Sequence, residues 1–317
     1  MPNFMTRRHA MALGSLAAGS LFTAGATNDA FAFAAEASQS EFPGSFAGEI
    51  HQILGAKPSM THGLLHVGID RKDIQNVELR GTPITPAFQI NGDLFFQMLP
   101  DGHTALMNGD FALKPSELNP FIHQLIAHQI IFQAEHQHLF NYEPMVWFVH
   151  FRAKGDPVQI ARGFKAALDT TSTPFPQSQP KNAKSPLPAE AMGKILGAKP
   201  TIKDGGVVSF SVPRAEHIRL GGEAANPYLN IAAPIAFQPL GDSGKAAAVP
   251  DFAMLAAEVN TVVGVMQSQG WEIGCLYNQE TDEHPQLYFS HQFKTGDALE
   301  LAREIRKGLD HTNSKFM

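Results

Sequence analysis

The amino-acid sequence predicts an α+β protein made of two tandem copies of one unit. Each copy is expected to hold a mainly antiparallel sheet, followed by helix, strand, strand and helix. Two observations carry this prediction: residues recur at a constant spacing, and in each half alternating apolar segments precede helical patterns. The chain has 317 residues, 44% of them hydrophobic, which is enough apolar material for one or two packed domains.

An identical hexapeptide, ILGAKP, reveals the repeat. It occupies residues 53–58 and 195–200, and from there the match continues at a spacing of 141 residues. The pairs at this spacing include Phe96 and Phe237, Asp110 and Asp251, Pro144 and Pro285, His150 and His291, and Leu168 and Leu309. One register kept over so many positions predicts repeat units at 46–169 and 189–311. The residues between them, 170–188, are rich in Pro, Ser, Asn and Lys and predict a linker.

Residues 1–34 predict a signal peptide of the twin-arginine type. Thr6-Arg7-Arg8-His9 precedes an uncharged, mildly apolar run from Ala10 to Ala26, and Ala-x-Ala sites follow. The run is too short to span a membrane, and no later stretch reaches about eighteen apolar residues. We therefore expect cleavage between Ala32 and Ala34 and a mature protein that is periplasmic or secreted.

Each copy is expected to begin with strands. The alternating segments are GLLHVGID, VELRG and DLFFQML in copy one, and GVVSFSV, HIRL and IAFQPL in copy two. A helix follows in copy one, with Ser116 as its expected N-cap. Its apolar face carries Leu118, Phe121, Ile122, Leu125 and Ile126, and the counterpart in copy two uses Val259, Val262, Val263 and Met266.

Two strands and a closing helix complete each copy. The strand segments are IIFQAEHQHLF and MVWFVHF in copy one, and WEIGCLYNQ and QLYFSHQF in copy two. Asp156 and Asp297 are the expected N-caps of the closing helices. Their inward faces are predicted to consist of Ile160, Phe164 and Leu168 in copy one, and Leu301, Ile305 and Leu309 in copy two.

The stretch AEHQHLFNYEPMVWFVHF, residues 134–151, carries the candidate site. Alternate residues of a strand share a face, which places Phe132, Ala134, His136 and His138 together. With a hairpin turn at 141–143, His136 pairs near Phe148 and Ala134 near His150, so His150 lies diagonally from His136. Three neutral imidazoles are suitable ligands for Zn or another transition metal, such as Cu or Ni, with a fourth position left for water or substrate.

Two alternatives to this metal site stay open. The histidines can satisfy one another on a half-buried sheet face and serve only the structure. A catalytic site would also need a carboxylate base, for which Glu143 in the turn is the nearest candidate. Copy two has Tyr277 and Gln279 in place of His136 and His138, which predicts a degenerate second site.

Other polar residues are expected to be structural. Cys275 is the only cysteine, so the chain has no intramolecular disulfide, and this residue is expected to be a small buried hydrophobe. His62 and His66 share strand parity with each other and are expected to be solvated. Asp110 and its repeat partner are expected in turns.

Charge and motifs limit the function classes. The net charge of −6 and the absence of a Lys/Arg run argue against a nucleic-acid partner. The sequence has no Gly-rich phosphate loop and no Gly-x-Ser-x-Gly turn. We rank a protein binding a metal or small polar ligand first. A non-catalytic protein that binds an envelope component comes second, and a metal-assisted hydrolase third; the oligomeric state is left open.

Three segments resemble a known family. GDFALKPSELNPFI, HQHLFNYEPMVWFVHF and GDPVQIARGFKAALD are similar to segments of the LppY/LpqO-like family of exported bacterial proteins, which is classed as a domain of unknown function. The residues matching its motifs are Gly109, Asp110, His136, His138, Glu143, Pro144 and His150. This chain departs from the pattern at Gln137, where the family has Asn, and in extra residues before Glu143. The resemblance implies export and duplication, and it implies no established activity.

Overall fold

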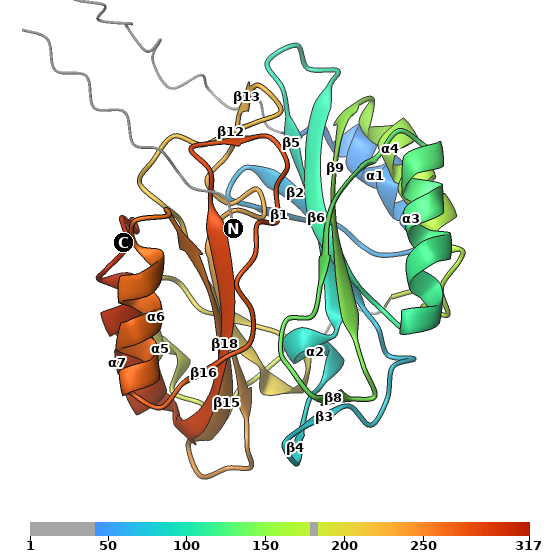
Figure 1. Cartoon of the computed structure of the whole chain (residues 1–317). Coiled ribbons are helices and arrows are strands. Elements are labelled where there is room, and N and C mark those ends of the chain that lie inside the picture. Colours follow the sequence, from blue (N-terminus) through green and yellow to red (C-terminus); the bar gives the residue numbers. More distant parts are fainter. Residues whose placement is uncertain (1–41, 178–182) are drawn as a thin grey trace, which may run out of the picture. The chain divides into compact units, whose positions relative to one another are not determined.

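A computed structural model describes residues 42–177 and 183–317 (Figure 1). These residues belong to one compact unit of the chain, so both repeats lie in the same unit. The expected signal peptide at 1–34 lies outside the described residues, as does part of the linker, 178–182.

The first repeat builds a six-stranded antiparallel sheet in the order β1-β2-β5-β6-β9-β7, with a small sheet β4-β3-β8 beside it. Its strands are β1 Ser59–Thr61, β2 Leu64–Asp70, β3 Glu78–Leu79, β4 Thr82–Pro83, β5 Asn91–Met98, β6 Ala105–Leu113, β7 Ile131–His136, β8 Tyr142–Glu143 and β9 Trp147–Gly155. Its helices are α1 Gly44–Leu54, α2 Pro86–Gln89, α3 Leu118–Ala127 and α4 Pro157–Leu168, with a 3₁₀ turn at Pro115–Glu117.

The second repeat has the same topology, with a sheet in the order β10-β11-β14-β15-β18-β16 and a small sheet β13-β12-β17. Its strands are β10 Thr201–Ile202, β11 Val208–Val212, β12 Arg219–Leu220, β13 Glu223–Ala224, β14 Ala233–Pro239, β15 Lys245–Met254, β16 Glu272–Ile273, β17 Glu283–His284 and β18 Tyr288–Asp297. Its helices are α5 Ala189–Leu196, α6 Val259–Ser268 and α7 Ala298–Leu309, with a 3₁₀ turn at Asp204–Gly206. The expected α+β class is confirmed, with antiparallel sheets and helices in both halves.

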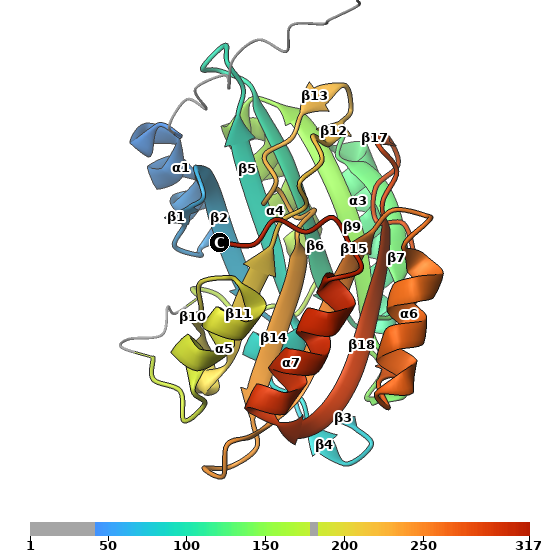
Figure 2. The ribbon, with the colours of Figure 1, turned by 90° about the vertical axis from the view of Figure 1, so that its left-hand side faces the viewer.

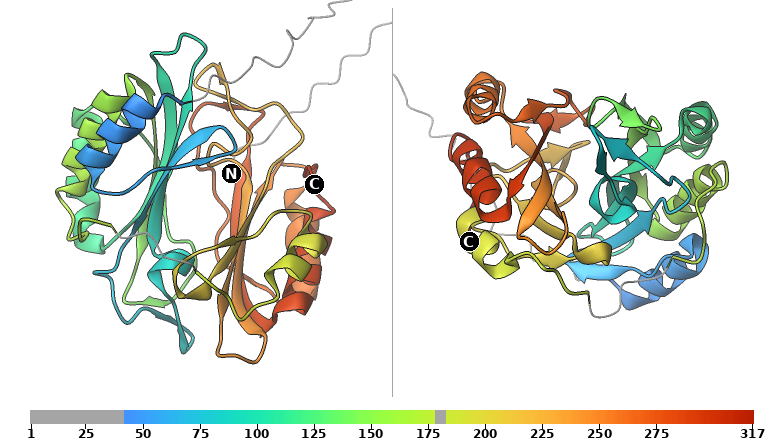
Figure 3. Two further views of the ribbon diagram at one scale, coloured as in Figure 1. Left: turned by 180° about the vertical axis from the view of Figure 1, so that it is seen from behind. Right: turned by 90° about the horizontal axis from the view of Figure 1, so that it is seen from below.

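The longer helices cover one face of each large sheet (Figure 3), while the short helix α2 lies on the other side, against β5 and β14. The faces of α1, α3 and α4 pack on the first sheet, where Phe121, Phe151 and Phe164 form part of one buried apolar cluster. In the second repeat α7 lies over β15 and β18 (Figure 2). The expected N-caps of the closing helices are confirmed, because the carboxylates of Asp156 and Asp297 accept hydrogen bonds from backbone N–H groups of the first turn.

The α3 start and the strand lengths differ from expectation. Ser116 is not the N-cap; it lies inside the 3₁₀ turn, and the Glu117 carboxylate accepts the Lys114 N–H instead. The strand segments expected at 77–81 and 271–279 are reduced to β3 and β16, of two residues each. Two long central strands, β6 and β15, were not predicted at all.

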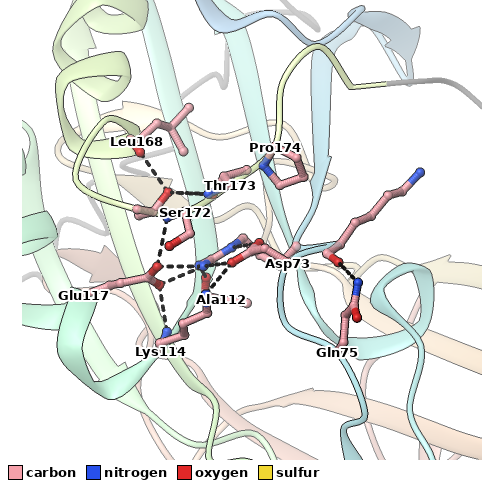
Figure 4. A network of polar contacts seen from close by, with 12 residues as sticks. Asp73, Gln75, Ala112, Lys114, Glu117, Leu168, Ser172, Thr173 and Pro174 are labelled. Atoms are coloured by element: carbon pink, nitrogen blue, oxygen red, sulfur yellow. Dashed lines mark hydrogen bonds and ion pairs between the residues drawn. The ribbon is translucent and has the colours of Figure 1, made fainter.

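Each repeat has a buried arginine whose hydrogen bonds connect the sheet with the turn before a helix, α3 in the first repeat and α6 in the second. In the first, Arg71 is fully buried and bonds Asp73, the Ala112 carbonyl and Glu117 (Figure 4). In the second, Arg214 makes the equivalent bonds to Glu216, the Ala253 carbonyl and Glu258. Such buried pairs cost several kcal/mol to break by removing one partner.

The faces that the longer helices leave uncovered meet, and two glutamines form reciprocal hydrogen bonds between them. Gln97 donates to the Ala224 carbonyl over 2.9 Å and accepts from the Asn226 N–H over 2.8 Å. Its equivalent, Gln238, donates to the Pro83 carbonyl over 2.6 Å and accepts from the Thr85 N–H over 2.9 Å. Each glutamine thus bonds the same backbone positions of the other repeat, 141 residues apart in the sequence.

A buried carboxyl adds to the contact between repeats. Glu280 of the second repeat is 4% exposed and accepts a 2.6 Å hydrogen bond from the Asn108 amide of the first. Burial raises its pKa to about 7, although the Asn108 bond acts in the opposite direction. The folded protein therefore keeps this proton at pH values where the unfolded chain has lost it.

The reciprocal glutamine bonds predict matched losses of stability. Gln97→Ala removes two hydrogen bonds, and Gln238→Ala removes three, the third from the Thr85 hydroxyl. Either change should lower the free energy of unfolding by about 2–4 kcal/mol. Denaturant unfolding measures the loss, with Gln267→Ala at an exposed position of α6 as the control. A loss confined to one of the two glutamines would contradict the reciprocal lock.

The raised pKa of Glu280 predicts that its replacement by Gln stabilises the protein more at high pH than at low pH. Because its folded pKa lies above the unfolded value of 4.5, its contribution is present below pH 4.5 and is lost as the pH rises through 7. We expect Glu280→Gln to raise the free energy of unfolding by about 3 kcal/mol at pH 8 and by less than about 1 kcal/mol at pH 5. Unfolding curves at both pH values test this, with the exposed Glu49→Gln as control. An equal effect at the two pH values would disprove it.

Candidate functional site

The three predicted histidines come from the ends of neighbouring strands. His136 is the last residue of β7, His138 follows two residues later, and His150 lies in β9. The expected pairing of His136 with Phe148 and of Ala134 with His150 is confirmed. Both strands turn these histidines toward the second repeat, away from the helices.

The expected face of Phe132 is wrong. A register shift between Phe132 and Ala134 adds one unpaired residue, Gln133, to β7. Phe132 therefore packs in the apolar cluster under the helices, while His136 faces the other repeat. Such a bulge moves a side chain to the opposite face of the sheet without ending the strand.

The histidine ligand atoms lie close enough together to share an ion. The Nε2 atoms of His136 and His150 are 2.9 Å apart, and one ligand atom from each of His136, His138 and His150 lies within 4.8 Å of the others. His138 is 7% exposed and His150 3% exposed. The structure thus gathers a buried group of three histidines that could hold a metal.

Hydrogen bonds define which nitrogen is available. His136 Nδ1 lies 3.2 Å from the Gln137 carbonyl, which can only accept, so Nδ1 carries the proton and Nε2 presents its lone pair. Three ring nitrogens have no hydrogen-bond partner among the described residues: both nitrogens of His138 and the Nδ1 of His150. A buried polar atom without a partner costs about 1–3 kcal/mol, so this group is set up at the expense of stability.

Burial keeps the imidazoles neutral. It lowers the pKa of His136 to about 4, and it places the pKa values of His138 and His150 well below the ordinary value for histidine. The neutral imidazole is the form that coordinates metal ions. At neutral pH all three side chains are therefore in the ligand form.

The second repeat closes over the histidines. The His138 ring stacks on His291 with ring centroids 3.7 Å apart, and the His136 ring stacks on Tyr277 at 3.6 Å. The Tyr277 hydroxyl donates to the Asp251 carboxylate over 3.1 Å. The site therefore lies between the repeats, with the residues that replace the histidines in copy two forming its other wall.

Asp110 and Asp251 were expected in turns, and this expectation is wrong. They lie within β6 and β15, directly opposite His150 and His291 on the neighbouring strands. Burial raises the pKa of Asp251 to about 8 and raises that of Asp110 well above its ordinary value. In the sequence, both the aspartate and the histidine recur at the same spacing of 141 residues, and this shared recurrence could have indicated that they belong to one site.

Glu143 is not brought to the histidines. It lies in β8, pairs with Glu78 in the small sheet and is exposed. Unlike Asp110 and Asp251, it does not line the cavity beside the histidines. The geometry therefore gives no support to Glu143 as a catalytic base.

A cavity of about 310 Å³ leads to the cluster and has walls from both repeats. His66 lines it and is half-buried rather than solvated, with Nε2 2.5 Å from Asp93. Although burial alone would raise the pKa of Asp93, the charge of Lys203 and the bond to His66 hold it below its ordinary value. His62 is exposed and stacks on Tyr228 at the same cavity.

Comparisons with known proteins identify the domain. The profile of the domain of unknown function DUF1259 matches residues 48–170 and again residues 190–311. No curated protein matches the chain significantly. Two solved structures align with 80% of this chain and 89% of their own, a trimeric bacterial microcompartment shell protein PduB at 12% identity and EtuB from Clostridium kluyveri at 10% identity. Both have a TM-score of 0.19, which is too low to indicate a shared fold. The chain belongs to the DUF1259 family and contains its domain twice.

Proposed function

We propose that this protein binds a transition-metal ion through His136, His138 and His150. The observation that carries the proposal is a group of ligand atoms within 4.8 Å of one another, buried between two sheets. Three of the six ring nitrogens have no hydrogen-bond partner among the described residues. Histidines that served only the structure would be expected to bond each other or the backbone. Here His136 bonds His150 and the Gln137 carbonyl, but His138 makes no hydrogen bond among the described residues and His150 uses only one of its nitrogens.

The geometry suits a small ion with nitrogen ligands. Zn–N bonds of about 2.0–2.1 Å in a tetrahedron put ligand nitrogens about 3.3 Å apart, close to the 2.9 Å between the Nε2 atoms of His136 and His150. Imidazole ligands suit Zn, Cu and Ni, whereas Mg and Ca prefer oxygen. Zn is the ion we propose first.

The cavity offers a route for a small polar ligand to the same place. It passes the His66–Asp93 pair and reaches His138, His150 and His291. Sites of this kind often form between two domains or repeats. The ion is therefore proposed to bind at the inner end of a cavity rather than on an exposed surface.

We also propose that the protein is exported and LppY/LpqO-like. The arginine pair and the Ala-x-Ala sites of residues 1–34 support export, although they lie outside the described residues. Over residues 42–177 and 183–317, no helix is both long and apolar enough to span a membrane. An envelope interaction protein without a metal remains the alternative, and a metal analysis separates the two.

Removing two ligands should remove the ion. We expect the mature protein, purified without chelator or nickel resin, to contain about one equivalent of Zn or another transition metal per chain. His136→Ala/His138→Ala should contain almost none and should remain folded. Elemental analysis with circular dichroism checks both expectations.

The matched control changes two histidines at exposed positions of the same repeat, His51→Ala/His103→Ala. It should keep the full metal content. Equal metal content in the site variant and the natural protein, or no metal in either, would contradict the proposal.

A further inference from the structure

The only cysteine of the chain lies beside the histidine cluster, on the other repeat. Cys275 occupies the position equivalent to Ala134, one of the residues opposite His150 in the first repeat. It was expected to be a small buried hydrophobe, but its surroundings are polar. Its Sγ lies 3.4 Å from His291 Nδ1.

A close backbone approach places the thiol there. At Gly274 a Cβ atom would lie 2.4 Å from the His138 carbonyl oxygen and 2.7 Å from Leu139 Cδ2, both of the first repeat. No side chain fits in that space. Only glycine lets the segment carrying Cys275 pack directly on the segment that carries His138.

The thiol belongs to a second group of ligand atoms that shares one histidine with the first. One ligand atom from each of His136, Cys275 and His291 lies within 4.8 Å of the others. Both groups contain His136, so the sulfur adjoins the group of three histidines without being one of its members. The carboxyl group of Asp251 lies next to this second group, 3.6 Å from His291 Nδ1.

An independent feature also points to a ligand at this place. The ring of His138 lies between Phe148 and His291, with centroid distances of 3.3 and 3.7 Å, and it is 7% exposed. Neither of its nitrogens has a hydrogen-bond partner among the described residues. The cysteine thus does not stand alone. The ring of His291, 3.4 Å from its sulfur, stacks on a buried imidazole whose nitrogens have no partner among the described residues.

We infer that Cys275 is a metal ligand that closes the coordination sphere of the ion from the second repeat. This inference rests on the proposed metal site. On binding, the thiol releases its proton to water and the thiolate sulfur bonds the ion, so one proton leaves for each ion bound. The centre then joins both repeats, and no single repeat contains it.

A thiolate ligand from Cys275 would decide whether the site keeps an open position for water. Sites that catalyse hydrolysis keep one position open for water, whereas structural and binding sites are closed by protein ligands. A thiolate in the fourth position makes this a closed binding centre and argues against the hydrolase. Mixed imidazole and thiolate donors select thiophilic ions, Zn²⁺ or Cu⁺, over Mn²⁺ and Mg²⁺.

Cobalt substitution tests the inference, because Co²⁺ takes zinc sites and a Co²⁺–thiolate bond gives charge-transfer absorption in the near ultraviolet. The chain has one cysteine, so such absorption in the mature protein can come only from Cys275. Cys275→Ala places there the residue that the first repeat has in the equivalent position. Leu276→Ala, at an adjacent residue that is 52% exposed, is the control.

We expect the natural protein and Leu276→Ala to show the charge-transfer band at one equivalent of Co²⁺. Cys275→Ala should still bind Co²⁺, roughly 10-fold or more weakly, without the band. Stoichiometric Co²⁺ binding to the natural protein without the band would overturn the role of Cys275 and leave the histidine site standing. No Co²⁺ binding to the natural protein would overturn both.

Discussion

Contact between the sheet faces that the longer helices leave uncovered is the constraint on which the rest of this structure depends. Helices cover one face of each sheet, so the opposite faces must be buried against each other. A shared apolar cluster, with members such as Phe148 and Val249, fills part of this space. The reciprocal bonds of Gln97 and Gln238 fix how the faces align. Duplication makes this possible, because one unit alone would leave an uncovered sheet face.

Burial at this contact gives the histidines their chemistry. On an open sheet they would be hydrated and would titrate near neutral pH. Between two sheets they are neutral, and three of their six nitrogens have no partner among the described residues. The two copies have diverged so that the contact is chemically asymmetric. The first supplies His136, His138 and His150, and the second supplies Cys275 and His291. The copy that is degenerate by sequence therefore provides the other half of the proposed centre.

Local patterns predicted much of the fold. Apolar periodicity located α4 and α7, and Asp156 and Asp297 marked where they begin. The expected register between β7 and β9, which brings His136 to His150, is also confirmed. The expected turn at 141–143 is not, because residues 142–143 form β8 of the small sheet. The confirmed features depend on neighbours in sequence or on one adjacent strand, so a single sequence contains them.

Features set by contact between the repeats could not be predicted in the same way. The alternation rule has no means of placing a bulge, so Phe132 was assigned to the wrong face. Strands β6 and β15 are buried on both sides and lack simple alternation, which hid the positions of Asp110 and Asp251. The neighbourhood of Cys275 depends on a close approach at Gly274 that only the folded contact reveals.

The most direct test of a metal centre between the sheets is anomalous diffraction at the zinc edge from a crystal of the mature protein grown with Zn²⁺. The account predicts one strong peak between the repeats, about 2.0–2.1 Å from His136 Nε2 and from nitrogens of His138 and His150. No peak at that place, with the Nε2 atoms of His136 and His150 still hydrogen-bonded to each other, would contradict it.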